Sequence, residues 1–117
     1  GSVPKLIAQA IAGFVERLFD EAGFDPEKEL ADSFVALHPG GPKIIDFAQE
    51  ALALRDEQLA HTRRVLFEHG NMSSATTPHI WKALLEDPNI PEGALIASIA
   101  FGPGLTICGT LLRIRLW

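Results

Sequence analysis

The chain has 117 residues, of which 47% are hydrophobic, and its formal net charge is −5. This length and composition predict one globular domain with one core and exclude a disordered chain. The lysines and arginines are scattered, which argues against a nucleic-acid-binding groove, and no apolar run approaches the length of a membrane span.

The opening residues GSVPK lack the charged and then apolar pattern of a signal peptide. Residues 1–2 have the form of a cloning scar, so we expect residues 3–117 to be one domain cut from a longer protein. The single cysteine, Cys108, excludes an internal disulfide and suits a reducing cytoplasm.

The first third of the chain predicts a helix and then a strand. Apolar residues recur at steps of three and four over residues 6–19, which predicts an amphipathic helix that ends at Gly23. A charged loop containing Pro26 follows. The short apolar segment 33–37 (SFVAL) then indicates a buried strand, and HPGGP breaks the chain directly after it.

Three helices are predicted next. The first begins near Pro42. The second covers residues 55–69 and ends at Gly70; its inward stripe consists of Leu59, Thr62, Val65 and Leu66. The third begins near Ser73 or Ser74, one of which we expect to be its N-cap, and stops at Asp87-Pro88.

The last part of the chain predicts a β-hairpin. Residues 94–101 (ALIASIAF) are an almost unbroken apolar run, which indicates a buried strand, and residues 105–112 (LTICGTLL) indicate a second strand. Cys108 lies between apolar neighbours, so we expect a buried, inert thiol. The whole order predicts an α/β fold in which several helices pack on a small mixed sheet.

Three loops carry the residues with chemical interest. His38 follows a strand and precedes Gly40 and Gly41, a position from which an imidazole can face a cleft, although a structural loop histidine explains it equally well. Asn71 follows a helix-ending glycine and, taken alone, is best explained as a turn residue. The FGPG turn at 101–104 is, alone, a hairpin turn. The spacing of the histidines gives no metal-binding motif, so we expect no metal site.

HPGGP, GNMSSA and FGPG, in that order and with these elements between them, resemble the C-terminal part of type III polyketide synthases. These are the chalcone synthase-like enzymes of the thiolase superfamily. The resemblance extends from VPKLIAQAI to IAFGPGLTICGTLLR. It implies that residues 3–117 form the C-terminal half of a thiolase-like fold. It also implies that the N-terminal half, with the nucleophilic cysteine of the family, is absent.

The resemblance also implies a reaction and a site. Such enzymes decarboxylate malonyl-CoA and condense it with an acyl-CoA starter, and they need no cofactor besides these CoA thioesters. By motif position, His38 and Asn71 match the catalytic histidine and asparagine, which together stabilise an oxyanion. The substrate cavity would be formed by Pro39, Gly40, Gly41, Lys43, Met72, Ser73, Phe101, Gly102, Pro103 and Gly104.

Cys108 follows every motif, so the family pattern does not make it the nucleophile, and we expect the isolated chain to be inactive. The expected partners are acyl-CoA, malonyl-CoA, the N-terminal half of the parent chain and a second copy in a homodimer. No nucleic acid or membrane is expected, and the expected location is the cytoplasm. Two alternatives stay open: a non-catalytic half-thiolase module that binds acyl-CoA or a partner chain, and a fragment of a third-type ketoacyl synthase or elongase-like condensing enzyme.

Overall fold

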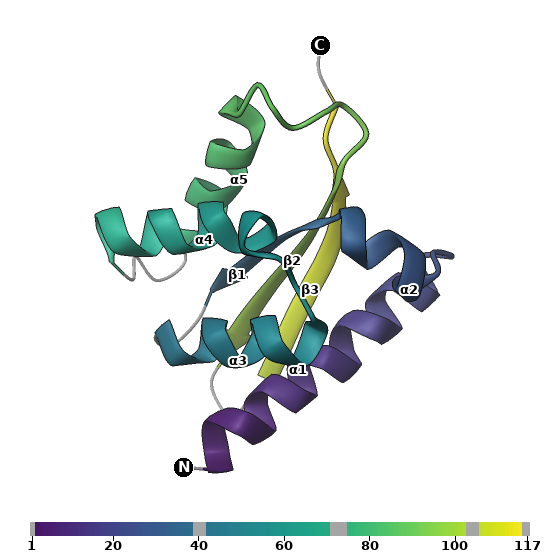
Figure 1. Ribbon diagram of the computed structural model, residues 1–117, viewed down its shortest axis with the longest axis vertical. Coiled ribbons are helices and arrows are strands. Elements are labelled where there is room, and N and C mark those ends of the chain that lie inside the picture. The colour runs from purple at the N-terminus through teal and green to yellow at the C-terminus, as the bar shows by residue number, and fades with distance from the viewer. Residues whose placement is uncertain (1, 39–41, 71–74, 103–105, 116–117) are drawn as a thin grey trace.

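The computed structural model describes residues 2–38, 42–70, 75–102 and 106–115. It contains helices on both faces of a small sheet (Figure 1). In chain order the elements are α1 (Ser2–Glu21), α2 (Pro26–Glu29), the 3₁₀ helix η1 (Leu30–Asp32), β1 (Phe34–His38), α3 (Pro42–Leu52), α4 (Asp56–His69), α5 (Thr76–Glu86), β2 (Leu95–Gly102) and β3 (Thr106–Arg113). The predicted α/β class is confirmed.

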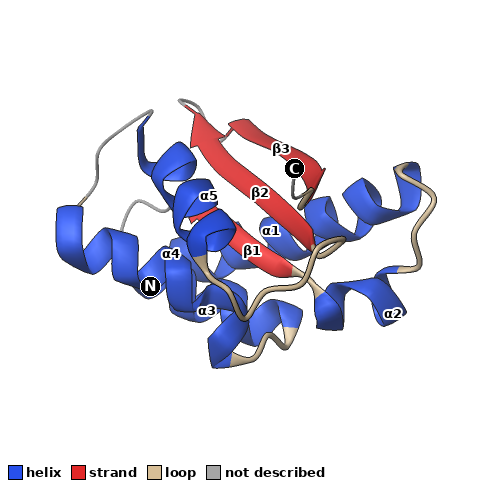
Figure 2. Cartoon of the chain, turned by 90° about the horizontal axis from the view of Figure 1, so that it is seen from above, coloured by secondary structure: helices blue, strands red, loops and turns tan. Residues whose placement is uncertain are grey.

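The sheet is mixed, with the strand order β1-β2-β3 (Figure 2). β1 pairs with β2 in parallel, and the register places Phe34 opposite Ile96 and His38 opposite Ala100. β2 and β3 pair antiparallel, from Leu95 opposite Arg113 to Gly102 opposite Thr106. The predicted hairpin is therefore present, and the crossover between β1 and β2 consists of α3, α4 and α5.

Two clusters of buried apolar side chains hold the helices to the sheet. Strand residues alternate between the two faces, so β1 and β2 contribute to both clusters. On one face α1 and α3 pack on the sheet, in a cluster that includes Ile11, Val15, Phe19, Val35, Leu37, Ile45, Ala97 and Ile99. On the other face the cluster includes Ala36, Val65, Ile80, Leu84, Ile96 and Ile114, with α5 as the main helix. Helix α4 lies along β1 and contributes Leu59 to the first cluster and Val65 to the second.

The charged segment after Gly23 is not the predicted loop but a short helix followed by η1. The side chain of Asp25 caps this helix by accepting from the backbone N–H of Glu27 at 3.0 Å, and Pro26 occupies its first turn. Ser33 Oγ donates to the carbonyl oxygen of Glu29 at 2.7 Å. This bond leaves Ser33 outside β1, so the strand begins one residue later than predicted.

Helix α5 begins at Thr76, and its N-cap is Ala75 rather than a serine. The helix therefore begins later than predicted, and the expected caps Ser73 and Ser74 lie outside the described residues. The predicted ends of the other helices are confirmed. Gly23 and Gly70 have positive φ angles of 85° and 69°, which suit a glycine after a helix.

Cys108 is exposed, so the prediction of a buried thiol was wrong. The physical reason is its place on β3, which forms one edge of the sheet. Ile107 and Leu111 point toward the cluster beneath α1, and alternation places Cys108 and Thr110 on the opposite face, where both are exposed. Local sequence does not reveal which strand of a hairpin has a covered face.

Within the described ranges, no helix combines the length and apolarity that crossing a membrane requires.

Candidate active site

His38 is the last residue of β1, as the sequence predicted for a residue at a strand end. Its neighbours Ala36 and Leu37 are fully buried, whereas the His38 side chain is partly exposed. Its Nδ1 atom is buried and has no hydrogen-bond partner within the described part of the chain. An imidazole held at the end of a strand and partly exposed can donate or accept a proton at a substrate atom.

Three elements end on the same side of the molecule (Figure 2). β1 and β2 are parallel, so the end at His38 lies beside Ala100 near the end of β2. Helix α4 runs in the same direction as β1, because its earlier residue Gln58 contacts Ser33 and its later residue Thr62 contacts Leu37. The three loops that the sequence singled out follow these three ends directly.

Most of the predicted cavity residues fall in those loops. Pro39, Gly40, Gly41, Asn71, Met72, Ser73, Pro103 and Gly104 lie outside the described residues. Phe101 and Gly102 are the last two residues of β2. Lys43 is exposed in the first turn of α3, directly after Pro42, where backbone N–H groups favour anions. Its place beside the CoA-binding path stays a prediction.

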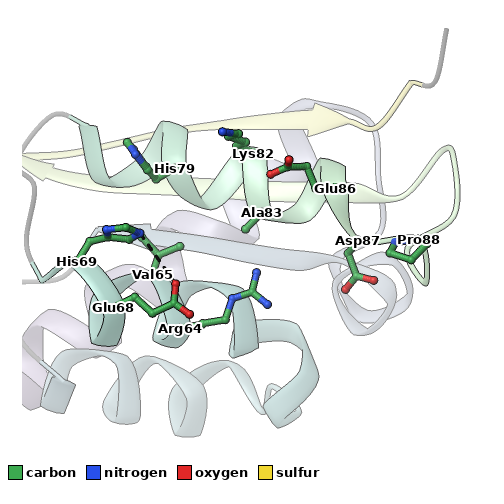
Figure 3. Close-up of a pocket in the computed structure, with 10 residues that line it drawn as sticks. All are labelled: Arg64, Val65, Glu68, His69, His79, Lys82, Ala83, Glu86, Asp87 and Pro88. Atoms are coloured by element: carbon green, nitrogen blue, oxygen red, sulfur yellow. Dashed lines mark ion pairs between the residues drawn. The ribbon is translucent and has the colours of Figure 1, made fainter.

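An open groove of about 450 Å³ lies between α4 and α5, and the sequence did not predict it (Figure 3). Its walls carry charges of both signs, with Arg64 and Glu68 on α4 and Lys82 and Glu86 on α5. Opposite charges on both walls give no net attraction for a polyanion such as CoA. No sequence motif marks this groove. Most of its residues come from two separate helices, α4 and α5, whose apolar faces pack against the sheet.

A buried histidine of α4 pairs with Asp87, one of the residues that line the groove. His61 is 8% exposed, and its Nε2 lies 2.9 Å from Oδ2 of Asp87. The pKa of the Asp87 carboxyl lies below its ordinary value, chiefly because the backbone N–H of Asn89 donates to it and then because His61 hydrogen-bonds to it. The pair joins α4 to the segment after α5. No local sequence pattern reveals this pair, because 26 positions separate the partners.

The described residues contain no group of three or more His, Cys, Asp or Glu side chains that could hold a metal ion. His69 and His79 come close, with ring centroids 5.6 Å apart, but Nδ1 of His79 is already 2.9 Å from the carbonyl oxygen of Ala75. Among the described residues at the strand ends, His38 contributes an imidazole.

The family model "Chalcone and stilbene synthases, C-terminal domain" matches residues 1–115. Type III polyketide synthase 21 of Oryza sativa subsp. japonica is 36% identical over 115 residues, which are 95% of this chain and 28% of that protein. Type III polyketide synthase A of Arabidopsis thaliana is 35% identical over 114 residues, again 95% of this chain and 29% of that protein. The chain thus spans less than a third of these relatives.

Solved structures agree with the sequence comparison. The C-terminal type III polyketide synthase domain of Steely1, a hybrid synthase from Dictyostelium, superposes with a TM-score of 0.87 at 29% identity, over 99% of this chain and 32% of that one. PKS-I from the brown alga Ectocarpus siliculosus gives a TM-score of 0.80 at 30% identity, over 98% of this chain and 31% of that one. The expected thiolase-like half-fold is confirmed.

Proposed function

Because the chain belongs to the chalcone and stilbene synthase family, as its C-terminal domain, we propose that it forms half of an acyltransferase that makes a polyketide from malonyl-CoA and an acyl-CoA starter. In this proposal His38 and Asn71 are the two side chains that this half contributes to catalysis. The parent enzyme is a homodimer in the cytoplasm.

The proposed reaction begins with the loss of CO₂ from malonyl-CoA. The bond between the α-carbon and the carboxylate breaks, and its electron pair forms an enolate whose charge rests on the thioester oxygen. The enolate carbon then attacks an acyl group held as a thioester on a cysteine, and that cysteine leaves as a thiolate. An imidazole N–H and an amide N–H aimed at the thioester oxygen stabilise it as it gains charge.

The observation that carries the proposal is the position of His38 at the end of β1, opposite Ala100 and on the side where α4 and β2 also end. This arrangement supports a site in which the HPGG, GNMSS and FGPG loops meet. Asn71 follows Gly70, the residue that caps α4. Pro39, Gly40, Gly41, Met72, Ser73 and the FGPG turn would line the cavity, and Lys43 would lie near the CoA phosphates.

The nucleophilic cysteine is proposed to come from the N-terminal half of the parent protein. By the family pattern Cys108 is not this nucleophile, because it follows every motif. In the sheet Ala100 lies between Cys108 and His38, so one strand separates the two residues. An imidazole such as His38 could also pair with the cysteine of the other half and keep it ionised for acyl transfer.

The proposal is tested by His38→Ala and Asn71→Ala in the full-length synthase, with release of CO₂ from malonyl-CoA labelled in its free carboxylate as the readout. Each substitution removes one donor, and we expect the rate to fall about 10²–10³-fold. His79→Ala is the matched control, because His79 is an exposed histidine on α5. A folded His38→Ala enzyme that decarboxylates at the wild-type rate would overturn the proposal.

A further inference from the structure

The outer edge of β1 is covered by a helix. One edge of this strand pairs with β2, and the N–H and C=O groups on its other edge need partners, because leaving them buried and unpaired costs free energy. Thr62 of α4 supplies both partners. Its Oγ1 accepts from the backbone N–H of Leu37 at 3.3 Å and donates to the carbonyl oxygen of Val35 at 2.7 Å.

This contact is shielded from water, since Thr62 is 1% exposed. One hydroxyl therefore satisfies a donor and an acceptor two residues apart, as a neighbouring strand would do. One helical turn earlier, Nε2 of Gln58 donates to the carbonyl oxygen of Ser33 at 2.6 Å. The two side chains fix the register of β1 against α4, from Ser33 directly before the strand to Leu37 near its end.

His38 follows Leu37 directly, and no hydrogen bond within the described residues orients its ring, since Nδ1 is buried without a partner. Catalytic histidines are commonly oriented by a hydrogen bond to the second ring nitrogen. Here the position of the imidazole depends on the backbone of β1. β2 holds that backbone on one edge, through the pairing of His38 with Ala100, and Thr62 holds it on the other.

We propose that Thr62 is a positioning residue for His38. The inference rests on the proposed function, in which His38 donates to the thioester oxygen. Without the hydroxyl, the end of β1 loses its attachment to α4, and the imidazole moves with the strand. A displacement of about 1 Å at a reacting group can lower a rate by about a hundredfold. Since Thr62 does not touch substrate, the loss falls on kcat and leaves KM nearly unchanged.

The test compares Thr62→Val and Thr62→Ser in the full-length synthase. Valine keeps the shape of threonine without the hydroxyl, and serine keeps the hydroxyl. We expect Thr62→Val to lower kcat for malonyl-CoA decarboxylation by roughly ten- to a hundredfold, and Thr62→Ser to restore most of it. Val65→Ala is the control, because it removes buried apolar volume from the same helix, whereas its side chain makes no hydrogen bond to β1. It should lower the melting temperature but not kcat.

The outcomes separate this inference from the proposed function. If His38→Ala abolishes decarboxylation while folded Thr62→Val keeps the wild-type kcat, the positioning role is overturned and the proposed function stands. If His38→Ala is itself fully active, both are overturned. Should Thr62→Val fail to fold, Thr62→Cys takes its place, because a thiol is a weak donor and acceptor. A wild-type kcat in that variant would likewise overturn the role of Thr62.

Discussion

Gly109 of β3 lies so close to Phe14 of α1 that a Cβ on this glycine would come within 2.5 Å of Phe14 Cε1. The same Cβ would lie 3.1 Å from the carbonyl oxygen of Ser98 on β2. The ring closes one side and backbone closes the other, so an added methyl group has little room. The missing side chain at position 109 thus determines how closely α1 can approach the sheet.

Gly109→Ala is expected to lower the free energy of unfolding by about 1–3 kcal/mol, because the extra methyl group must displace α1 or the Phe14 ring. Urea denaturation of the two proteins measures this difference. The matched control is Gly13→Ala in α1, where a Cβ would meet only the guanidinium of Arg17 at 3.4 Å. There alanine should stabilise the helix by about 0.5–1 kcal/mol. A Gly109→Ala protein as stable as the wild type would contradict this account.

Asp87 should make the stability of the fold depend on acid pH. Its pKa is lowered in the folded state by the Asn89 N–H and by His61. The stabilisation is therefore complete above the ordinary carboxyl pKa of about 3.9 and is lost as the pH falls below it. Asp87→Asn should reduce the urea midpoint at pH 7, and the gap from the wild type should shrink as the pH falls below about 4. Asp20→Asn, at an exposed position of α1, is the control. A gap that stays constant down to pH 2 would argue against this role.

The exposed Cys108 thiol should react in the folded protein. We expect a disulfide reagent such as DTNB to label one thiol per chain without denaturant, and Cys108→Ser to abolish the signal. The label adds volume only on the face of β3 away from α1, so the melting temperature should change little. Labelling that appears only in denaturant would mean that this face of β3 is covered in solution.

The isolated chain should release no CO₂ from malonyl-CoA and form no polyketide. In the proposed mechanism the acyl group is held on a cysteine of the N-terminal half, and the family pattern does not make Cys108 that nucleophile. Product analysis by mass spectrometry, with the full-length synthase as the positive control, checks this expectation. Polyketide formed by the purified chain would show that the catalytic set lies elsewhere.

The elements with a long, regular pattern could be predicted from the sequence. The apolar steps of α1 and α4 and the apolar run of β2 each mark a face that must be buried. Even the burial of Thr62 follows from its place in the inward stripe of α4. The short helix α2 escaped prediction because four residues give no periodicity, although Asp25 and Pro26 are a recognisable helix start.

Features that depend on contacts between distant helices and strands could not be predicted from local sequence patterns. The exposure of Cys108 depends on β3 being an edge strand whose face is uncovered at Cys108 and Thr110. The pairs His61–Asp87 and Thr62–Leu37 join residues 26 and 25 positions apart. The candidate site could be predicted in part. The position of His38 at a strand end follows from the apolar segment before it and the glycines after it. The chemical role proposed for His38 rests on the combination of three loops.

The most direct test of the central claim is a double-mutant cycle in the full-length synthase, with the rate of malonyl-CoA decarboxylation as the readout. If His38 and Asn71 stabilise the same oxygen, they act as a unit. Each single substitution should then cost about 10²–10³, and the double variant should lose little more than either single one. Losses that multiply in the double variant, or a single variant with the wild-type rate, would contradict the claim that this domain supplies a joint oxyanion site.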